Sequence, residues 1–254
     1  MIKVSIITVC FNSKRFIDSA IRSVVFQNYK NIEYIIIDGN SSDGTVAVIN
    51  CYSDKIAHIV SEPDKGIYDA MNKGLALATG DIVGILNSDD FYPNENIISQ
   101  VVAEFNTNQE IDMVLGNVDF VDPNNLNSMI RFYSSFKFKP WMMRFGFMPA
   151  HPGAFIKKTA YDRIGNYTLG YKIGADFEWF VRAFFTKKLA FTKLNKSLVR
   201  MREGGVSTSG LSSYWVSSKE QLRALKTNGV YSNLLFVFTR LPIKLLHKVF
   251  RKHN

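Results

Sequence analysis

Gly80-Asp81-Ile82-Val83-Gly84-Ile85-Leu86-Asn87-Ser88-Asp89-Asp90 is the stretch of sequence that decides the fold. A short apolar run rich in Ile and Val is typical of a buried parallel strand. The run ends abruptly in polar and acidic residues, and ligands of open α/β sheets bind beyond the carboxyl ends of strands. Asp89 and Asp90 therefore indicate a site for a divalent cation and, through it, a phosphate. The alternative is that they cap a helix starting near residue 94, because Asp and Asn favour caps and turns.

The residues before this stretch alternate between strand and helix patterns. Strand patterns cover residues 3–9, 33–37, 56–61 and 80–86, and helical spacing covers residues 15–27, 46–52 and 67–78. This order predicts a mostly parallel α/β sheet wound with helices. Because such crossovers are right-handed, all four strands should end at one edge of the sheet. The residues expected at that edge are Phe11, Asn12, Asp38, Asp43, Asp64, Lys65, Asp89 and Asp90. Four such strand exits favour a ligand site over four separate caps.

The ligand expected at this edge is a nucleoside diphosphate bound through a cation. No glycine-rich phosphate loop follows the first strand, so backbone amides alone would not neutralise a diphosphate. A cation on Asp89 and Asp90 would do so. Phe11 is placed to stack on a nucleobase, and Asp38 is placed to accept a hydrogen bond from a base N–H or a ribose hydroxyl.

Composition limits the class of protein. The 254 residues, 46% hydrophobic and 21% charged, suit one α/β domain with an extension or two small domains. Two cysteines are too few for a disulfide framework or a structural zinc site. No apolar stretch reaches the roughly 18 residues that a membrane span needs. Since no secretory signal is visible after Met1, we expect a reducing, cytoplasmic location.

Four stretches of this sequence resemble the successive motifs of glycosyltransferase family 2. They are residues 4–12 (Val-Ser-Ile-Ile-Thr-Val-Cys-Phe-Asn), 35–45 (Ile-Ile-Ile-Asp-Gly-Asn-Ser-Ser-Asp-Gly-Thr), 61–74 (Ser-Glu-Pro-Asp-Lys-Gly-Ile-Tyr-Asp-Ala-Met-Asn-Lys-Gly) and 86–90 (Leu-Asn-Ser-Asp-Asp). The resemblance extends over residues 3 to about 207. It implies a GT-A fold, with a Rossmann-like sheet, and an inverting enzyme that uses nucleotide-activated sugars.

The resemblance also implies roles for residues at the sheet edge. Val9 and Phe11 would border the nucleobase, and Asp38 would contact it. The other residues placed near the nucleotide-sugar are Asn12, Asp64, Lys65, Asn72, Ser88 and Asp89. Asn87-Ser88-Asp89 replaces the D-x-D motif of the family, and Asn87 stands where many relatives have Asp. The cation, Mg²⁺ or Mn²⁺, would therefore rest on Asp89 or Asp90, with Asp89 slightly favoured.

Residues 174–182 resemble the family's E-D-x-x-L-x-x-R element, whose Asp is the catalytic base. Matching the element places Asp176 as the base and Arg182 as the Arg, with Ala175 in the place of Glu. An inverting transferase needs one carboxylate to deprotonate the acceptor hydroxyl. The alternative is that Asp176 and Glu178 only complement a helix dipole.

Three further residues are candidates for acceptor or diphosphate contact, together with Glu178 and Arg182. His151 is one of them, and the alternative is that it is a structural histidine whose hydrogen bonds are made within the core. Arg200 and Arg202, followed by Gly204 and Gly205, indicate a loop that closes over the diphosphate, with a solvated turn as the alternative.

The carboxyl-terminal part of the chain carries much of the net charge of +9. Seven basic residues follow Glu220, the last acidic residue. A basic tail, unlike a basic body, indicates a surface or a protein partner rather than nucleic acid. Residues 230–254 combine five of these basic residues with bulky apolar residues, a pattern typical of the membrane interface. Packing on protein, including a second copy in a homo-oligomer, is the alternative.

These observations predict a catalytic domain over residues 1–208 and an amphipathic helical extension over residues 209–254. Within the domain, residues 1–118 would bind the nucleotide and residues 119–208 the acceptor. The predicted enzyme is a metal-dependent inverting glycosyltransferase, peripheral on the inner face of the plasma membrane. Its donor would be a UDP-sugar, and its acceptor a lipid-linked saccharide in cell-surface polysaccharide synthesis.

Two other functions stay open at this point. A sugar nucleotidyltransferase would carry a glycine-rich basic loop after the first strand, which this sequence does not have there. A catalytically silent nucleotide-sugar-binding scaffold would lack a base, and Asp176 argues against it.

Overall fold

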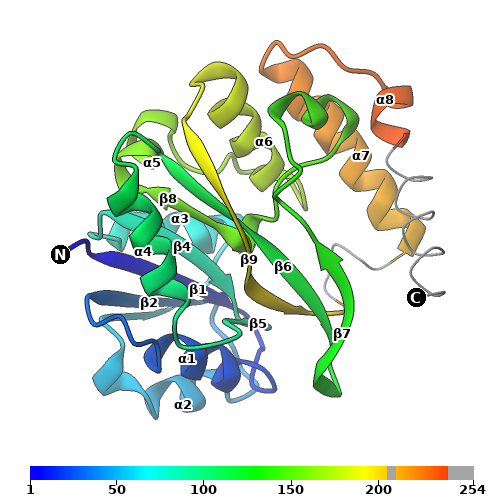
Figure 1. Ribbon diagram of the computed structural model, residues 1–254. Coiled ribbons are helices and arrows are strands. Elements are labelled where there is room, and N and C mark those ends of the chain that lie inside the picture. Colours follow the sequence, from blue (N-terminus) through cyan, green and yellow to red (C-terminus); the bar gives the residue numbers. More distant parts are fainter. Residues whose placement is uncertain (205–209, 240–254) are drawn as a thin grey trace. The chain divides into compact units, whose positions relative to one another are not determined.

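A computed structural model gives the fold and describes residues 1–204 and 210–239. In this part of the chain, nine strands form one mixed sheet (Figure 1). The strands are β1 (Val4–Cys10), β2 (Ile32–Asp38), β3 (His58–Ser61), β4 (Ile82–Asn87), β5 (Asp90–Phe91), β6 (Met113–Asp122), β7 (Asn125–Tyr133), β8 (Ala154–Lys157) and β9 (Phe191–Arg202). The α-helices are α1 (Ile17–Val25), α2 (Thr45–Asn50), α3 (Ile67–Leu77), α4 (Ile97–Thr107), α5 (Lys158–Ile164), α6 (Ala175–Val181), α7 (Gly210–Thr227) and α8 (Leu234–Phe238).

The strand order is β3-β2-β1-β4-β8-β6-β9-β5, with β7 paired to β6. Strands β1, β2, β3 and β4 are parallel, and β9 runs parallel to β6. Strand β8 is antiparallel to both of its neighbours, β4 and β6. The α/β class and the mostly parallel sheet expected from the sequence are therefore confirmed, and the first four strands do end at one edge.

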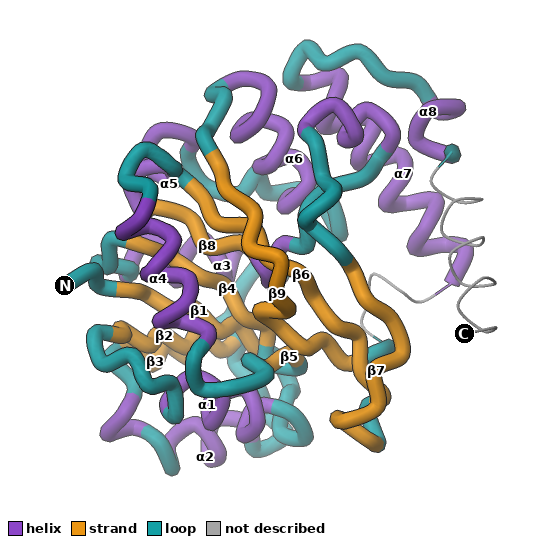
Figure 2. The backbone as a smooth tube through the Cα atoms, viewed as in Figure 1, coloured by secondary structure: helices purple, strands orange, loops and turns teal. Residues whose placement is uncertain are grey.

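Helices cover both faces of the sheet because its central strands are apolar on both sides. Ile6 and Ile36 belong to a core cluster that also contains apolar residues of α1 and α4. Ile7 points to the other face, where α3 approaches so closely that a Cβ on Gly74 would lie 2.4 Å from Ile7 Cγ2. In Figure 2, α4 crosses in front of the strands and α3 lies behind them. Helices therefore pack on both faces of the strands whose ends carry the candidate site.

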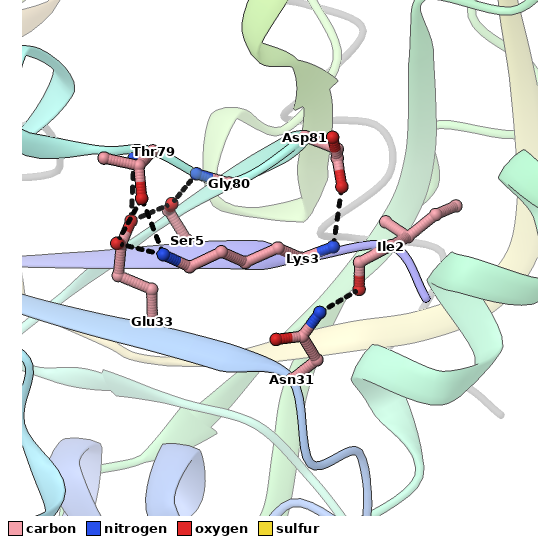
Figure 3. Close-up of polar contacts among 8 residues, drawn as sticks. All are labelled: Ile2, Lys3, Ser5, Asn31, Glu33, Thr79, Gly80 and Asp81. Atoms are coloured by element: carbon pink, nitrogen blue, oxygen red, sulfur yellow. Dashed lines mark hydrogen bonds and ion pairs between the residues drawn. The ribbon is translucent and has the colours of Figure 1, made fainter.

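A polar cluster ties the strand starts together at the end of the sheet opposite the candidate site (Figure 3). Glu33 accepts hydrogen bonds from Lys3 Nζ at 2.5 Å, from Ser5 Oγ at 2.5 Å and from Thr79 N at 2.8 Å. Burial acts to raise the pKa of Glu33, but these hydrogen bonds outweigh it and lower the pKa to about 2. Ser5 also accepts a bond from Gly80 N, so one side chain links the starts of β1, β2 and β4.

The chain divides into two compact units that are interleaved in sequence. The first unit contains Met1–Phe136, Pro149–Leu169 and Leu189–Glu203, and therefore the whole sheet. The second contains Lys137–Met148, Gly170–Lys188 and Gly204–Asn254. Helices α6, α7 and α8 belong to the second unit. The boundaries at residues 118 and 208 stay predictions.

Two segments differ from the sequence-based expectation. The helix expected to start near residue 94 begins at Ile97, and Phe91 lies in β5, because Pro93 and the following polar residues form the turn between them. The expected loop containing Arg200 and Arg202 is wrong, since both lie in β9, whose backbone pairs with β6 and β5. Gly205, the second glycine of that loop, lies outside the described residues.

The described helices include none that is long and apolar enough to cross a membrane. Of the expected amphipathic extension, α7 and α8 are present. Five of the seven basic residues that follow Glu220 lie outside the described residues: Arg240, Lys244, Lys248, Arg251 and Lys252.

Candidate functional site

The carboxyl ends of β1, β2, β3 and β4 meet at one edge of the first unit. The strand register pairs Cys10 with Asp38 and Asp38 with Ser61. On the other side of β1, Val9 pairs with Asn87. Parallel pairing in this register brings the predicted motifs together, although up to about eighty residues separate them in the sequence.

Asp38 is the polar centre of this edge and is fully buried. One carboxylate oxygen accepts hydrogen bonds from Ser41 N at 2.9 Å and Ser61 Oγ at 2.7 Å. The other oxygen accepts hydrogen bonds from Ser41 Oγ and, at 3.4 Å, from Cys10 Sγ. Burial acts to raise the pKa of Asp38, but the hydrogen bonds outweigh it and the pKa is lowered. Contact between Asp38 and a nucleobase stays a prediction, and it would require some of these bonds to be exchanged.

Phe11 and Asp64 form an accessible surface on either side of Gly39. Phe11 is 63% exposed. A Cβ on Gly39 would lie 2.6 Å from Asp64 Oδ2 and 3.3 Å from Phe11 Cδ2, so glycine is needed here for the close approach. Asp64 Oδ1 accepts a hydrogen bond from Gly66 N, which fixes the turn after β3. An exposed aromatic ring beside a carboxylate can stack on a base and bind a polar group of the same ligand.

The loops after β1 and β4 are joined by two hydroxyl groups. Ser13 Oγ lies 2.8 Å from Ser88 Oγ, and both side chains are buried. Asn12 has a left-handed backbone with φ 48°, and its Oδ1 accepts a hydrogen bond from Ser42 N. These bonds hold the loops in one arrangement, so Ser88 contributes to the shape of the edge.

Asn87 ends β4, Ser88 and Asp89 form the turn that follows, and Asp90 begins β5. Asp90 is fully buried, and its Oδ2 accepts a hydrogen bond from Asn87 Nδ2 at 3.2 Å. Asn87 Oδ1 and Asp90 Oδ1 are buried without a hydrogen-bond partner. Burial raises the pKa of Asp89, and burial followed by the charge of Asp89 raises the pKa of Asp90 well above its ordinary value.

This turn fits a hard divalent cation, which prefers oxygen ligands. The two unpartnered oxygens are acceptors that a cation would satisfy, and Asp89 is the more accessible of the two carboxyl groups. Mg²⁺ is commonly held by one or two carboxylates with substrate phosphates completing its coordination. Residues 1–204 and 210–239 contain no group of three or more His, Cys, Asp or Glu side chains arranged to hold a metal ion by themselves.

Arg202 points into the protein and supports this turn. Its guanidinium donates hydrogen bonds to the main-chain carbonyl of Asp89 and, at 2.8 Å, to Ser19 Oγ. It also lies over the rings of Phe16 and Phe91, at 5.2 and 5.0 Å from their centroids. The neighbouring Arg200 has a buried Nε without a hydrogen-bond partner. Diphosphate contact by either arginine stays a prediction.

Of the remaining predicted residues of the first unit, Asn72 and His151 are within hydrogen-bond distance of Tyr167, and Lys65 lies at the surface. Asn72 makes two hydrogen bonds to the main chain of Tyr167, both 2.9 Å. His151 is buried, and its Nε2 lies 2.7 Å from the hydroxyl of Tyr167. Burial lowers the pKa of His151 to about 4, so the imidazole is neutral at pH 7. The side chain of Lys65 is exposed.

Asp176 lies in the first turn of α6, in the second unit. Its Oδ1 accepts a hydrogen bond from Phe177 N at 2.8 Å, and the side chain is partly exposed. In the same turn, Glu178 forms a largely buried ion pair with Arg182, with two contacts from Arg182 Nε and one from Nη2 at 2.9 to 3.1 Å. Their mutual pairing gives both residues a structural role, and their contact with an acceptor stays a prediction.

A known family matches the amino-terminal part of the chain. The model of glycosyl transferase family 2 matches residues 5–165, which is more than half of the chain. The chain belongs to this family. Its identity to an uncharacterized glycosyltransferase of Mycobacterium tuberculosis is 32% over 183 residues, covering 71% of this chain and 68% of that protein.

Solved structures show the same fold. Staphylococcus aureus TarS 1–349 in complex with UDP-GlcNAc superposes with a TM-score of 0.70 at 18% identity, covering 88% of this chain and 66% of that one. Glucosyl-3-phosphoglycerate synthase from M. tuberculosis, in complex with Mn²⁺, UDP and phosphoglyceric acid, gives a TM-score of 0.64 at 19% identity, covering 91% and 80%. The GT-A fold is therefore confirmed, and the chain spans just under two thirds of the TarS fragment.

Family 2 membership makes the chain a glycosyltransferase and removes the nucleotidyltransferase alternative. The match ends before Asp176, so the role of this residue rests on the resemblance of residues 174–182.

Sequence reasoning missed four residues of the edge. They are Ser13, Gly39, Ser41 and Ser61, which bond or lie against the predicted residues. Only their position in the sequence could have indicated them, because each lies at or just after the carboxyl end of a strand that is followed by a predicted site residue.

Proposed function

We propose that this family 2 chain is a metal-dependent inverting glycosyltransferase that moves a sugar from a UDP-sugar to a hydroxyl of a saccharide. The observation that carries the proposal is the pair of unpartnered buried oxygens on Asn87 and Asp90, at the same sheet edge as exposed Phe11. An aromatic ring for the base and oxygen ligands for a cation are what a nucleoside diphosphate requires. The structures of similar fold that contain UDP-GlcNAc, or UDP with Mn²⁺, support this choice of donor and metal.

The donor is held by residues of the first unit. Phe11 stacks on the uracil, and Asp64 accepts a hydrogen bond from a hydroxyl of the nucleotide-sugar. Asp89 would hold Mg²⁺ or Mn²⁺, and the buried oxygens of Asp90 and Asn87 would be further acceptors for it. When bound, this cation neutralises charge on the diphosphate leaving group.

Transfer with inversion is a single displacement. The acceptor oxygen forms a bond to the anomeric carbon while the bond from that carbon to the diphosphate oxygen breaks, and its electron pair leaves with UDP. The proton of the acceptor hydroxyl goes to a carboxylate oxygen of Asp176, which acts as general base. An α-linked donor therefore gives a β-linked product without a covalent enzyme intermediate.

A binding screen tests the donor. UDP-glucose, UDP-galactose, UDP-GlcNAc and GDP-mannose are each added with Mn²⁺, and the melting temperature is measured, because a ligand that binds only the native state raises it. We expect at least one UDP-sugar to raise the melting temperature in Mn²⁺ and to do so less in EDTA. Stabilisation by GDP-mannose alone, or by no nucleotide, would contradict the proposed donor.

The base is tested by Asp176→Asn. Removing a general base typically costs 10²- to 10⁴-fold, so we expect transfer to fall by about 10³-fold. Donor affinity measured by calorimetry should stay within about two-fold of wild type. Asp54→Asn makes the same change at a side chain that is 72% exposed and should leave transfer unchanged. Full transfer by Asp176→Asn would refute the base assignment, and absence of transfer in the wild type would favour the silent scaffold.

We further propose a lipid-linked acceptor and peripheral attachment to the inner face of the plasma membrane. In the second unit, Trp141, Tyr231 and Leu235 are 56%, 69% and 79% exposed. Exposed aromatic and aliphatic side chains, in a chain whose sequence also carries a basic segment, are typical of the membrane interface. Such attachment would place the enzyme in the cytoplasm beside lipid-linked saccharides.

Vesicle sedimentation tests the attachment. The chain should sediment with phosphatidylglycerol vesicles and much less with phosphatidylcholine vesicles, because each Lys or Arg near an anionic surface adds about 1 kcal/mol. Replacing Arg240, Lys244 and Lys248 by Gln should weaken sedimentation. Equal binding to both kinds of vesicle, or none, would contradict the proposal.

A further inference from the structure

Glu220 of α7 binds the stretch of main chain that leads into α6. Its Oε1 accepts a hydrogen bond from Lys172 N at 2.8 Å, and its Oε2 accepts from Ile173 N and Gly174 N, both at 3.0 Å. One carboxylate therefore satisfies three successive backbone N–H groups. Hydrogen bonds to a charged acceptor are about twice as strong as those between neutral groups. All four residues belong to the second unit.

Gly174 permits this approach. A Cβ at this position would lie 3.2 Å from Glu220 Cβ and 3.3 Å from Glu220 Oε2, which is closer than ordinary packing. The φ of Gly174 is −110°, a value that any residue adopts. A side chain at this position would displace Glu220 by a few tenths of an ångström, so the contact with Glu220, and not the backbone conformation, favours glycine.

The same helical segment holds the chain on the other side of Asp176. Asn228, directly after α7, donates a hydrogen bond from Nδ2 to Glu178 Oε1 at 3.1 Å. Arg223 lies over the ring of Tyr171 at 4.5 Å from its centroid and donates to the carbonyl of Gly170 at 3.3 Å. Side chains from residues 220–228 thus contact residues 170–174 and Glu178, and Asp176 lies between these contacted positions in the sequence.

We propose that Glu220 is a positioning residue for Asp176, and that α7 is part of the catalytic machinery. The proposal rests on the proposed function, in which Asp176 is the base. Asp176 follows the third bound N–H group by two residues, so the path of residues 172–174 sets where its carboxylate lies. Ala175, in the place of the Glu of the family element, is fully buried and has no side-chain acceptor. The carboxylate that binds the N–H groups of residues 172–174 is supplied by α7.

The kinetic test uses Glu220→Gln and Glu220→Asp with the donor and acceptor that support transfer by the wild type. In Glu220→Gln, the amide NH₂ replaces one accepting oxygen, so at least one N–H group loses its partner. A misplacement of about 1 Å can cost about 10²-fold in rate. We expect kcat to fall 10- to 100-fold in Glu220→Gln and less in Glu220→Asp, with the KM for the donor within two-fold of wild type.

Glu110→Gln is the matched control, since Glu110 is exposed and the chemical change is the same. It should leave kcat unchanged. Unchanged kcat in Glu220→Gln, or an equal loss of kcat and of donor affinity, would overturn the positioning role. This failure is distinct from failure of the proposed function, which would appear as full transfer by Asp176→Asn.

Hydrogen exchange gives a second readout that needs no substrate. The amides of residues 172–174 should exchange at least 10-fold faster in Glu220→Gln than in the wild type, while amides of β1 and β4 stay unchanged. Faster exchange throughout both units would show general destabilisation and would overturn the proposal, as would unchanged exchange at residues 172–174.

Discussion

Arg202 donates a hydrogen bond to the main-chain carbonyl of Asp89, although 113 residues separate them in the sequence. The guanidinium reaches this carbonyl from β9, which pairs with the two-residue strand β5 directly after Asp89. Because its other donor group binds Ser19, Arg202 connects the candidate cation turn to α1. The Arg202 side chain therefore holds the turn at Asp89 in place without a bound ligand.

Arg202→Lys should weaken both the fold and cation binding. A lysine cannot span two acceptors with a planar fork, so one of the two hydrogen bonds is lost. Hydrogen bonds that involve a charged group contribute about 1.5–3 kcal/mol each, and we expect unfolding by urea to show a loss of this size. Mn²⁺ affinity, measured by calorimetry in the presence of UDP, should fall several-fold.

Arg163→Lys is the control for this change, because Arg163 is 54% exposed and pairs with Asp112 at the surface. It should change stability by less than about 1 kcal/mol. Equal effects of the two substitutions would contradict a specific role of Arg202 at the turn.

Phe11→Ala should weaken nucleotide binding without changing stability. The ring is exposed, so its removal leaves no cavity, whereas stacking on a base contributes about 1–3 kcal/mol. We expect the Kd for UDP in Mn²⁺ to rise between about 5- and 150-fold. Phe26→Ala, at a ring that is 61% exposed on α1's carboxyl-terminal side, should leave the Kd within two-fold. Similar Kd values for wild type and Phe11→Ala would remove the stacking assignment.

The residues of the sheet edge could be predicted because the signal is local. Polar residues follow each of the first four strands, and parallel winding brings the strand ends to one edge of the sheet. The strand pattern alone therefore places Phe11, Asp64 and Asp89 at that edge. Whether such a carboxylate faces a ligand or the protein does not follow from it. Asp38 resembles a ligand contact in the sequence, yet Ser41 and Ser61 engage it inside the protein.

The contacts that could not be predicted join distant segments. Strand β9 contains Lys193, Asn195, Lys196, Arg200 and Arg202, so its apolar alternation is weak, and its place beside β6 is set by tertiary pairing. The bonds of Glu220 likewise depend on how α7 packs against α6. No local pattern of residues carries that information.

Glu33→Gln should give a pH-dependent loss of stability at the other end of the sheet. Hydrogen bonds lower the folded pKa of Glu33 to about 2, below its ordinary value of 4.5. A lowered folded pKa contributes stability that is present above pH 4.5 and is lost as the pH falls towards 2. We therefore expect the wild type to exceed Glu33→Gln by about 1–3 kcal/mol at pH 7, and the difference to shrink between pH 4 and pH 2.

Urea unfolding at several pH values measures this difference, with Glu110→Gln as an exposed control. A difference between wild type and Glu33→Gln that stays constant from pH 7 to pH 2 would show that the ionised carboxylate is not what stabilises the strand starts.

Asp90→Asn should separate cation binding from the stability of the free protein. Burial, and then the charge of Asp89, raise the pKa of Asp90 well above its ordinary value, so ionising this group in the absence of a cation costs free energy. Asn is nearly the same size and carries no charge. In EDTA at pH 7 we therefore expect Asp90→Asn to be at least as stable as the wild type in urea unfolding.

With UDP and Mn²⁺ the wild type should be more stable than Asp90→Asn, because a cation that binds more tightly stabilises the native state more and favours the ionised carboxylate. Asp54→Asn should respond to Mn²⁺ as the wild type does. If Mn²⁺ stabilised Asp90→Asn and the wild type equally, the cation would have to rest on Asp89 without Asp90.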